Sequence, residues 1–214
     1  MKKFAVILAG SGVYDGSEIH EATLTMLAIM QHGGSYQCFA PDVDQHHVIN
    51  HLNGEEMKET RNVLVESARI ARGDVKKLSE FKPDDFDVLI MPGGFGVAKN
   101  LCDFAFRGAD CTVNPTVAEA VKLMHKAGKP IGALCISPVI ISKVLGDVEL
   151  TLGQDQGTID NVEKMGSRHT KTTHGEVIVD KKHKVFTTPC YMLDANIQQI
   201  WEGANNIIKA ILDY

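Results

Sequence analysis

The segment GALCISP, residues 132–138, holds the strongest candidate for chemistry in this sequence. Cys135 stands where an apolar run ends and a helix-like stretch begins. A nucleophile on such a sharp turn needs small neighbours two residues away on either side, and Ala133 and Ser137 meet that need. The start of a helix also favours a thiolate over a thiol. The pattern indicates a nucleophilic cysteine; the alternative is a buried core cysteine.

A glycine-rich turn, PGGFG at residues 92–96, follows another apolar run. It is not a phosphate-binding P-loop, because Lys99 is followed by Asn100 instead of by serine or threonine. Paired glycines at a strand end leave backbone N–H groups open, and these could hold a developing oxyanion. The alternative is a simple tight turn.

Two acidic residues, Glu18 and Glu21, open the first helix-like stretch and share one face of it. First-turn acids commonly do no more than complement the helix dipole. If one of them points over the sheet edge towards Cys135, burial beside a thiolate favours its protonated form. Such an acid could donate a hydrogen bond to the sulfur and carry protons during a reaction.

Other chemical motifs in the sequence are less specific. The segment GSGVYDG, residues 10–16, departs from a dinucleotide fingerprint, because its third glycine comes one residue late and the expected downstream acid is missing. His174 and Glu176 have the spacing of amidotransferase triads, but no strand end places them beside the cysteine. Cys190 could be a second thiol near the site, and a packed small residue is the simpler interpretation.

These candidates need a sheet whose strand ends bring them together. Strand-like apolar runs alternate with helix-like stretches, which predicts an α/β fold: a three-layer αβα sandwich with a mainly parallel sheet. Predicted strands cover residues 4–9, 36–40, 86–91 and 131–134, with a hairpin at 177–179 and 185–187; predicted helices cover 17–32, 62–72, 114–128, 137–145 and 193–212.

Particular residues delimit these predicted elements. Asp15 or Ser17 is expected to cap the first helix, and Asn114-Pro115 is typical of a helix start. The polar segment 41–61 contains three histidines, yet their spacing favours a solvated loop over a metal site.

Composition bounds the class of protein. The chain has 214 residues, 44% of them hydrophobic, and a net charge of −5, which favours one globular domain spanning 1–214. Mixed charges give no footprint for nucleic acid, and no apolar run is long enough for a membrane span. Five scattered cysteines without a C-x-x-C pair indicate a reducing compartment, and we expect a cytoplasmic protein.

Several segments together resemble a known superfamily. VILAGSG, MPGGFG, GALCISP and VIVDKKHKVFTTPCYM are similar to the PfpI and parkinsonism-associated deglycase group of the class I glutamine amidotransferase-like, flavodoxin-like fold. Within that group GVYDGSEIHE, PGGFGVAKNL and TTPCYML resemble the ElbB family, described as glyoxalase-like, sigma cross-reacting or enhancing lycopene biosynthesis. The resemblance spans essentially the whole chain, and its link to isoprenoid synthesis rests on the family name alone.

The resemblance implies roles for particular residues. Cys135 is the implied nucleophile, and Glu21 is the implied acid, with Glu18 in reserve. The implied oxyanion donors are the backbone N–H groups of Gly94 and Ile136. No residue matches the superfamily histidine that follows the nucleophile, which argues against a protease or glutaminase.

The expected activity is a glutathione-independent glyoxalase, a lyase that converts glyoxal or a similar small α-oxoaldehyde to a 2-hydroxy acid such as glycolate. No cofactor or metal motif accompanies the site. Two alternatives stay open: a redox-sensing or protective cysteine protein with little turnover, and, with less support, a glutaminase that uses His174 and Glu176. A small aldehyde is the expected partner, and the superfamily implies a homodimer.

Overall fold

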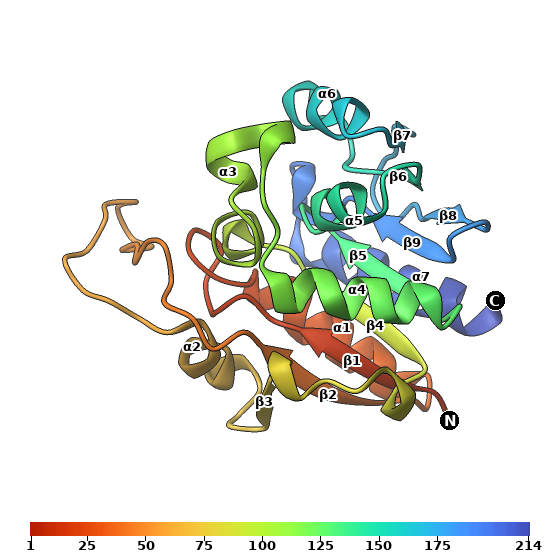
Figure 1. Cartoon of the computed structure of the whole chain (residues 1–214), viewed down its shortest axis with the longest axis horizontal. Helices are drawn as coiled ribbons and strands as arrows, with labels where there is room; N and C mark the ends of the chain where they lie inside the picture. Colours follow the sequence, from red (N-terminus) through yellow and green to blue (C-terminus); the bar gives the residue numbers. More distant parts are fainter.

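The computed structural model describes all residues, 1–214, as a central seven-stranded sheet between two layers of helices (Figure 1). The strands, in sheet order, are β3 (Val75–Lys77), β2 (Ser35–Ala40), β1 (Lys3–Ile7), β4 (Val88–Met91), β5 (Ile131–Leu134), β9 (Val185–Thr188) and β8 (Ile178–Asp180). Every neighbouring pair is parallel except the hairpin β8–β9. The predicted three-layer α/β fold with one antiparallel edge is confirmed.

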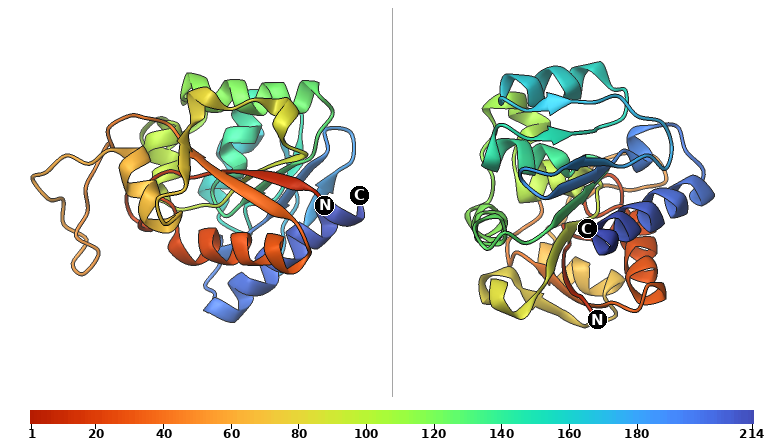
Figure 2. Two further views of the ribbon diagram at one scale, coloured as in Figure 1. Left: turned by 90° about the horizontal axis from the view of Figure 1, so that it is seen from below. Right: turned by 90° about the vertical axis from the view of Figure 1, so that its right-hand side faces the viewer.

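Helices cover both faces of this sheet. They are α1 (Ile19–Gln31), α2 (Val63–Ile70), α3 (Phe104–Arg107), α4 (Pro115–Lys126), α5 (Pro138–Leu145), α6 (Gln156–Lys164) and α7 (Ile197–Asp213). Helices α1 and α7 lie together against one face, and α4 lies against the other (Figure 2). No helix has the combined length and apolar character that crossing a bilayer requires.

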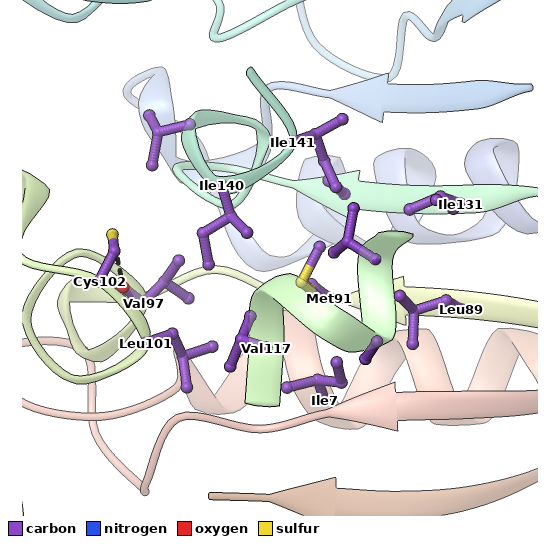
Figure 3. Packing of buried hydrophobic residues seen from close by; sticks show 14 of the residues in the cluster. Ile7, Leu89, Met91, Val97, Leu101, Cys102, Val117, Ile131, Ile140 and Ile141 are labelled. Atoms are coloured by element: carbon purple, nitrogen blue, oxygen red, sulfur yellow. Dashed lines mark hydrogen bonds between the residues drawn. The ribbon is translucent and has the colours of Figure 1, made fainter. Parts of the chain in front are cut away.

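Side chains of β1 alternate between the two faces, as a strand buried on both sides requires. Phe4 and Val6 pack into the core beneath α1 and α7, whereas Ala5 and Ile7 pack into the core beneath α4 and α5. Figure 3 shows the second core, to which Ile7 of β1 and Val117 of α4 both belong. Both cores pack against the sheet and thereby fix the carboxyl ends of its strands, where the candidate site lies.

The predicted helix starts are confirmed in one case and corrected in another. Asn114 caps α4 by accepting the N–H of Thr116, and Pro115 follows it as predicted. Helix α1 is capped by Glu18, whose carboxylate accepts the N–H of Glu21 at 2.7 Å. The prediction of an Asp15 or Ser17 cap is wrong.

Ser17 and Asp15 serve other backbone groups instead. The Ser17 hydroxyl accepts the N–H of Ala9 at 2.8 Å, and the Asp15 carboxylate accepts the N–H of Ile49 at 2.7 Å. Capping preference is a local property, and here these longer-range bonds outweigh it.

Residues 41–61 form the predicted loop, which projects from the body of the molecule as an arm (Figure 1). Its histidines contact aromatic rings: His46 lies 4.2 Å from Phe106 and His51 lies 4.9 Å from Tyr14, measured between ring centroids. No three metal-ligating side chains come together in the chain.

The sequence did not predict β3, α3, α6 or the small parallel pair β6 (Glu149–Leu150) and β7 (Arg168–His169).

Candidate active site

Cys135 occupies a sharp turn between β5 and α5, as the sequence predicts. Its backbone φ is +59°, in the left-handed region that side chains other than glycine rarely adopt. The turn is held from both sides: the Cys135 N–H donates to the carbonyl of Thr188 at 3.0 Å, and the Ser137 hydroxyl donates to the carbonyl of Pro92 at 2.6 Å. These two hydrogen bonds fix the backbone of the turn and place the sulfur at the carboxyl end of the sheet.

Glu21 is the acid that reaches this sulfur. Its side chain is fully buried, and its carboxyl group lies beside the Cys135 thiol, since a Cβ on Gly93 would lie within 2.8 Å of both groups. One carboxyl oxygen also accepts the N–H of Gly93 at 2.8 Å, and the other accepts the N–H of Tyr191 at 3.2 Å. The two candidate acids therefore have different roles, because Glu18 caps α1 by accepting the N–H of Glu21.

The protonation of Glu21 follows from its surroundings. Burial, together with the negative charge of Glu18, raises the pKa of Glu21 to about 8 despite the opposing hydrogen bonds. At neutral pH the carboxyl group is therefore mainly protonated. Because both oxygens already accept backbone N–H groups, its proton can be donated to Cys135.

The thiol of Cys135 is not acidified, contrary to the sequence expectation. Burial raises the pKa of Cys135, and the neighbouring Glu21 raises it further. The N–H groups of Gly94 and Ile136 hydrogen-bond with the sulfur and lower the pKa, but their effect is smaller. The helix start therefore does not by itself yield a thiolate, because burial beside an acid outweighs it. The resting pair holds a thiol and a protonated carboxyl group.

Gly93 and Gly94 are glycines for steric reasons. A Cβ at Gly93 would lie 2.7 Å from the Glu21 carboxylate and 2.8 Å from the Cys135 sulfur. Gly94 has φ +104°, and a Cβ there would collide with the backbone of Gly16 and Glu18. The segment 10–16, which partly matches a dinucleotide fingerprint, packs against this turn, and the Gly96 N–H donates to Gly16 at 2.9 Å. Its glycines allow two backbones to approach.

One turn of α1 holds Gly93 from both sides. The Glu21 carboxyl group accepts the Gly93 N–H at 2.8 Å, and the Glu18 N–H donates to the Gly93 carbonyl at 2.9 Å. The acid and the glycine turn are thus fixed relative to each other.

The other predicted candidates lie apart from the sulfur. Glu176 hydrogen-bonds with Thr173, and neither His174 nor Glu176 contacts Cys135. The Cys-His-Glu arrangement of a glutaminase is not formed. Cys190 lies nearby in the short 3-10 helix η5 (Cys190–Met192) but does not line the cavity described next.

A cavity of about 400 Å³ opens over Cys135. It is lined by Val13, Glu18, Gly94, Phe95, Cys135, Ile136, Asp155, Thr158, Tyr191 and Met192. Sequence reasoning missed Asp155 and Thr158, which begin α6, and Tyr191, which follows β9. Tyr191 could have been predicted from the pairing of β9 with β5, because the carboxyl ends of neighbouring parallel strands lie at the same end of the sheet.

Tyr191 also brings a histidine to the edge of the site. Its hydroxyl group lies 2.8 Å from Nδ1 of His20, an exposed residue in the first turn of α1. The contact ties η5 to the first turn of α1.

The chain is similar to a known protein family and to several proteins of animals. A model of the DJ-1/PfpI family matches residues 13–189. The glutamine amidotransferase-like class 1 domain-containing protein 3, mitochondrial, of Homo sapiens is 43% identical over 99% of this chain and 82% of its own length. The ES1 protein homolog, mitochondrial, of Rattus norvegicus is 44% identical over 99% of this chain and 83% of its own length.

Solved structures agree on the fold. An isoprenoid biosynthesis protein with an amidotransferase-like domain from Ehrlichia chaffeensis is 37% identical, covers 99% of both chains and superposes with a TM-score of 0.92. Glyoxalase III from Candida albicans covers 99% of this chain and 96% of its own, with a TM-score of 0.65 and 15% identity, a likeness of fold.

The cytoplasmic location expected from the cysteines is wrong by this comparison, because the human, rat and Danio rerio relatives are mitochondrial proteins. Unpaired thiols indicate a reducing compartment. They do not distinguish the cytoplasm from the reducing interior of an organelle.

Proposed function

The chain belongs to the DJ-1/PfpI family, and from this premise we propose that it is a glutathione-independent glyoxalase acting on small α-oxoaldehydes such as glyoxal. One observation carries the proposal: the Glu21 carboxyl group and the Cys135 sulfur lie together against Gly93, and Cys135 shares one cavity wall with Gly94 and Ile136. A nucleophile, a proton carrier and oxyanion donors thus meet beneath a cavity.

In the first step the Cys135 sulfur bonds to one aldehyde carbon while the carbonyl electron pair moves to oxygen. The Cys135–Glu21 pair enters this step after losing one of its two protons. The developing oxyanion accepts the N–H groups of Gly94 and Ile136. It then takes the remaining proton from Glu21, which gives a neutral hemithioacetal and a Glu21 carboxylate.

Glu21 next moves a proton between the two carbons. Its carboxylate removes the hydrogen from the sulfur-bearing carbon, and the electron pair passes to the second carbonyl oxygen, which takes up that proton to give an enediol. Glu21 then removes the hydroxyl proton at the first carbon and returns it to the second carbon. The product is a thioester of glycolate, with no net oxidation.

Water completes the reaction by attacking the thioester carbon. The carbon–sulfur bond breaks, the sulfur regains a proton, and glycolate leaves. The overall change is addition of one water to glyoxal, so the residues described here balance the reaction without a redox partner.

The direct test follows glyoxal loss and glycolate formation with wild-type protein and the Cys135→Ala variant. We expect turnover in the wild type alone. Equal rates for the two proteins would refute the proposal.

Within the family, the segments 12–21 and 187–193 support assignment to the ElbB type. One domain over 1–214 and a homodimeric state are also part of this proposal.

A further inference from the structure

The cavity over Cys135 has a one-sided charge. Glu18 and Asp155 line it from opposite elements, the first turn of α1 and the start of α6, and none of its ten lining residues is lysine or arginine. The Asp155 carboxylate accepts the N–H of Thr158 at 2.8 Å as the N-cap of α6. Hydrogen bonds from Thr158 lower the pKa of Asp155, which keeps that group charged at neutral pH.

A basic group lines the neighbouring cavity instead. Lys99 lies over the Phe95 ring, 5.5 Å from its centroid, and its ammonium group donates to the carbonyl of Tyr14 at 2.8 Å. It lines the adjacent cavity formed with the arm, and Phe95 stands between the two cavities as a shared wall.

Much of the remaining wall is apolar, and the volume is large for a two-carbon substrate. Val13, Phe95, Ile136 and Met192 supply hydrophobic surface, and the cavity holds about 400 Å³. Pockets of about 300–1,000 Å³ accommodate drug-sized ligands. Glyoxal would leave most of this wall uncovered.

We infer that the Cys135 cavity selects uncharged or cationic carbonyl compounds that carry an apolar substituent, and that it discriminates against carboxylates and phosphates. This inference rests on the proposed function, since it assigns a substrate class to the same nucleophile. A negative substrate group would enter beside two carboxylates, the buried Glu18 and the exposed Asp155, with no cation lining the cavity, and like charges oppose binding. An apolar group would instead remove hydrophobic wall from water.

Alkylation of Cys135 tests the charge rule without requiring turnover. Iodoacetamide and iodoacetate deliver a similar group to a thiol, but only the second is an anion. Peptide mass spectrometry measures both rates at Cys135 at neutral pH, and N-acetylcysteine amide provides the ratio for a free thiol. We expect the amide-to-acetate ratio at Cys135 to exceed that reference about tenfold or more.

Two substitutions on α6 sharpen the test. Asp155→Asn keeps a capping oxygen for Thr158 but removes the charge, and we expect it to lower the ratio severalfold. Asp160→Asn is the matched control, because Asp160 is exposed on the same helix and does not line the cavity. The inference is overturned if the wild-type ratio equals that of the free thiol, if Asp155→Asn leaves it unchanged, or if neither reagent reaches Cys135.

Kinetics separates this inference from the proposed function. Across glyoxal, methylglyoxal and phenylglyoxal we expect kcat/KM to rise, and we expect 4-carboxyphenylglyoxal, an α-oxoaldehyde that adds a carboxylate to the phenylglyoxal ring, to be a much poorer substrate than phenylglyoxal. Absence of turnover combined with a high alkylation ratio would refute the glyoxalase and leave the charge rule standing. Turnover of 4-carboxyphenylglyoxal equal to that of phenylglyoxal would refute the charge rule alone.

Discussion

Cys135 and Cys190 are two buried cysteines that follow the carboxyl ends of neighbouring strands, β5 and β9, and each has a positive backbone φ, +59° and +43°. Burial raises the pKa of both thiols, and the charge of Glu21 adds to each. Their partners differ. Cys135 lies beside the Glu21 carboxyl group and lines a cavity with Gly94 and Ile136, whereas the Cys190 sulfur faces Gly203 of α7.

This difference shows that strain and burial do not make a cysteine a nucleophile. A reactive position also needs donors for the charge that develops and space for a substrate. Cys135 has both, and Cys190 has packing neighbours.

The largest effect should come from replacing each thiol in turn. Cys135→Ala should reduce kcat for glyoxal by about 10³-fold or more, because it removes the group that bonds to substrate. Cys190→Ala should leave kcat within about threefold, since small changes away from the reacting atoms alter little. Glycolate formation measures both. Comparable losses in the two variants would erase the distinction between the cysteines.

Glu21 and Glu18 provide the next contrast. Glu21→Gln should lower kcat by about 10²–10⁴-fold, the usual contribution of a positioned acid or base. Glu18→Gln keeps a capping oxygen for the Glu21 N–H and should reduce kcat by less than about tenfold. Steady-state kinetics with circular dichroism as a check on folding decides between them. A larger loss for Glu18→Gln would move the proton-carrying role to that residue.

Stability should fall as pH rises, because the folded protein binds the Glu21 proton more tightly than the unfolded chain does. The pKa of Glu21 rises from 4.5 to about 8 on folding. Its penalty is absent below pH 4.5, grows through the interval and is complete above pH 8. At about 1.36 kcal/mol per pH unit the upper bound is about 5 kcal/mol.

Urea unfolding at intervals from pH 5 to pH 8.5 measures this slope. Glu21→Gln should flatten it, because glutamine does not titrate. A wild-type profile parallel to that of the variant would show that Glu21 ionises normally in the folded protein.

The smallest effect concerns the packing of Cys190. A Cβ at Gly203 would lie 3.1 Å from the Cys190 sulfur, tighter than ordinary contact. In the Cys190→Ala background, Gly203→Ala should stabilise α7 by about 1 kcal/mol, the helix preference of alanine over glycine. In the wild type the gain should be smaller or reversed. Equal effects in both backgrounds, measured by urea unfolding, would contradict the packing assigned to this sulfur.

Much of the fold and part of the site could be predicted from the sequence, because their signals are local. The apolar runs of β4 and β5 and the Asn114-Pro115 helix start act within a few residues. The turn at Cys135 is recognisable for the same reason. Glu21 required the family resemblance, because first-turn acids occur on many helices that carry no site.

Other features depend on contacts distant in sequence. Asp155 lines the cavity only because α6 packs beside the β5 turn, and no local pattern predicts that placement. The pKa of Cys135 depends on burial and on Glu21, more than a hundred residues away in the chain, so the local helix argument gave the wrong direction. Short strands such as β3, three residues long, carry too few side chains for a period to emerge.

The bonds that α1 makes to both sides of Gly93 have a consequence for local opening. Unwinding of the first turn of α1 releases the Gly93 amide from Glu21 and, by the same event, the Glu21 amide from its capping residue Glu18. These two amides therefore belong to one cooperative unit, and their hydrogen–deuterium exchange should proceed at matching protection. Local unfolding would then disrupt Glu21 and the glycine turn at residues 93 and 94 together, so that partly formed sites are not populated.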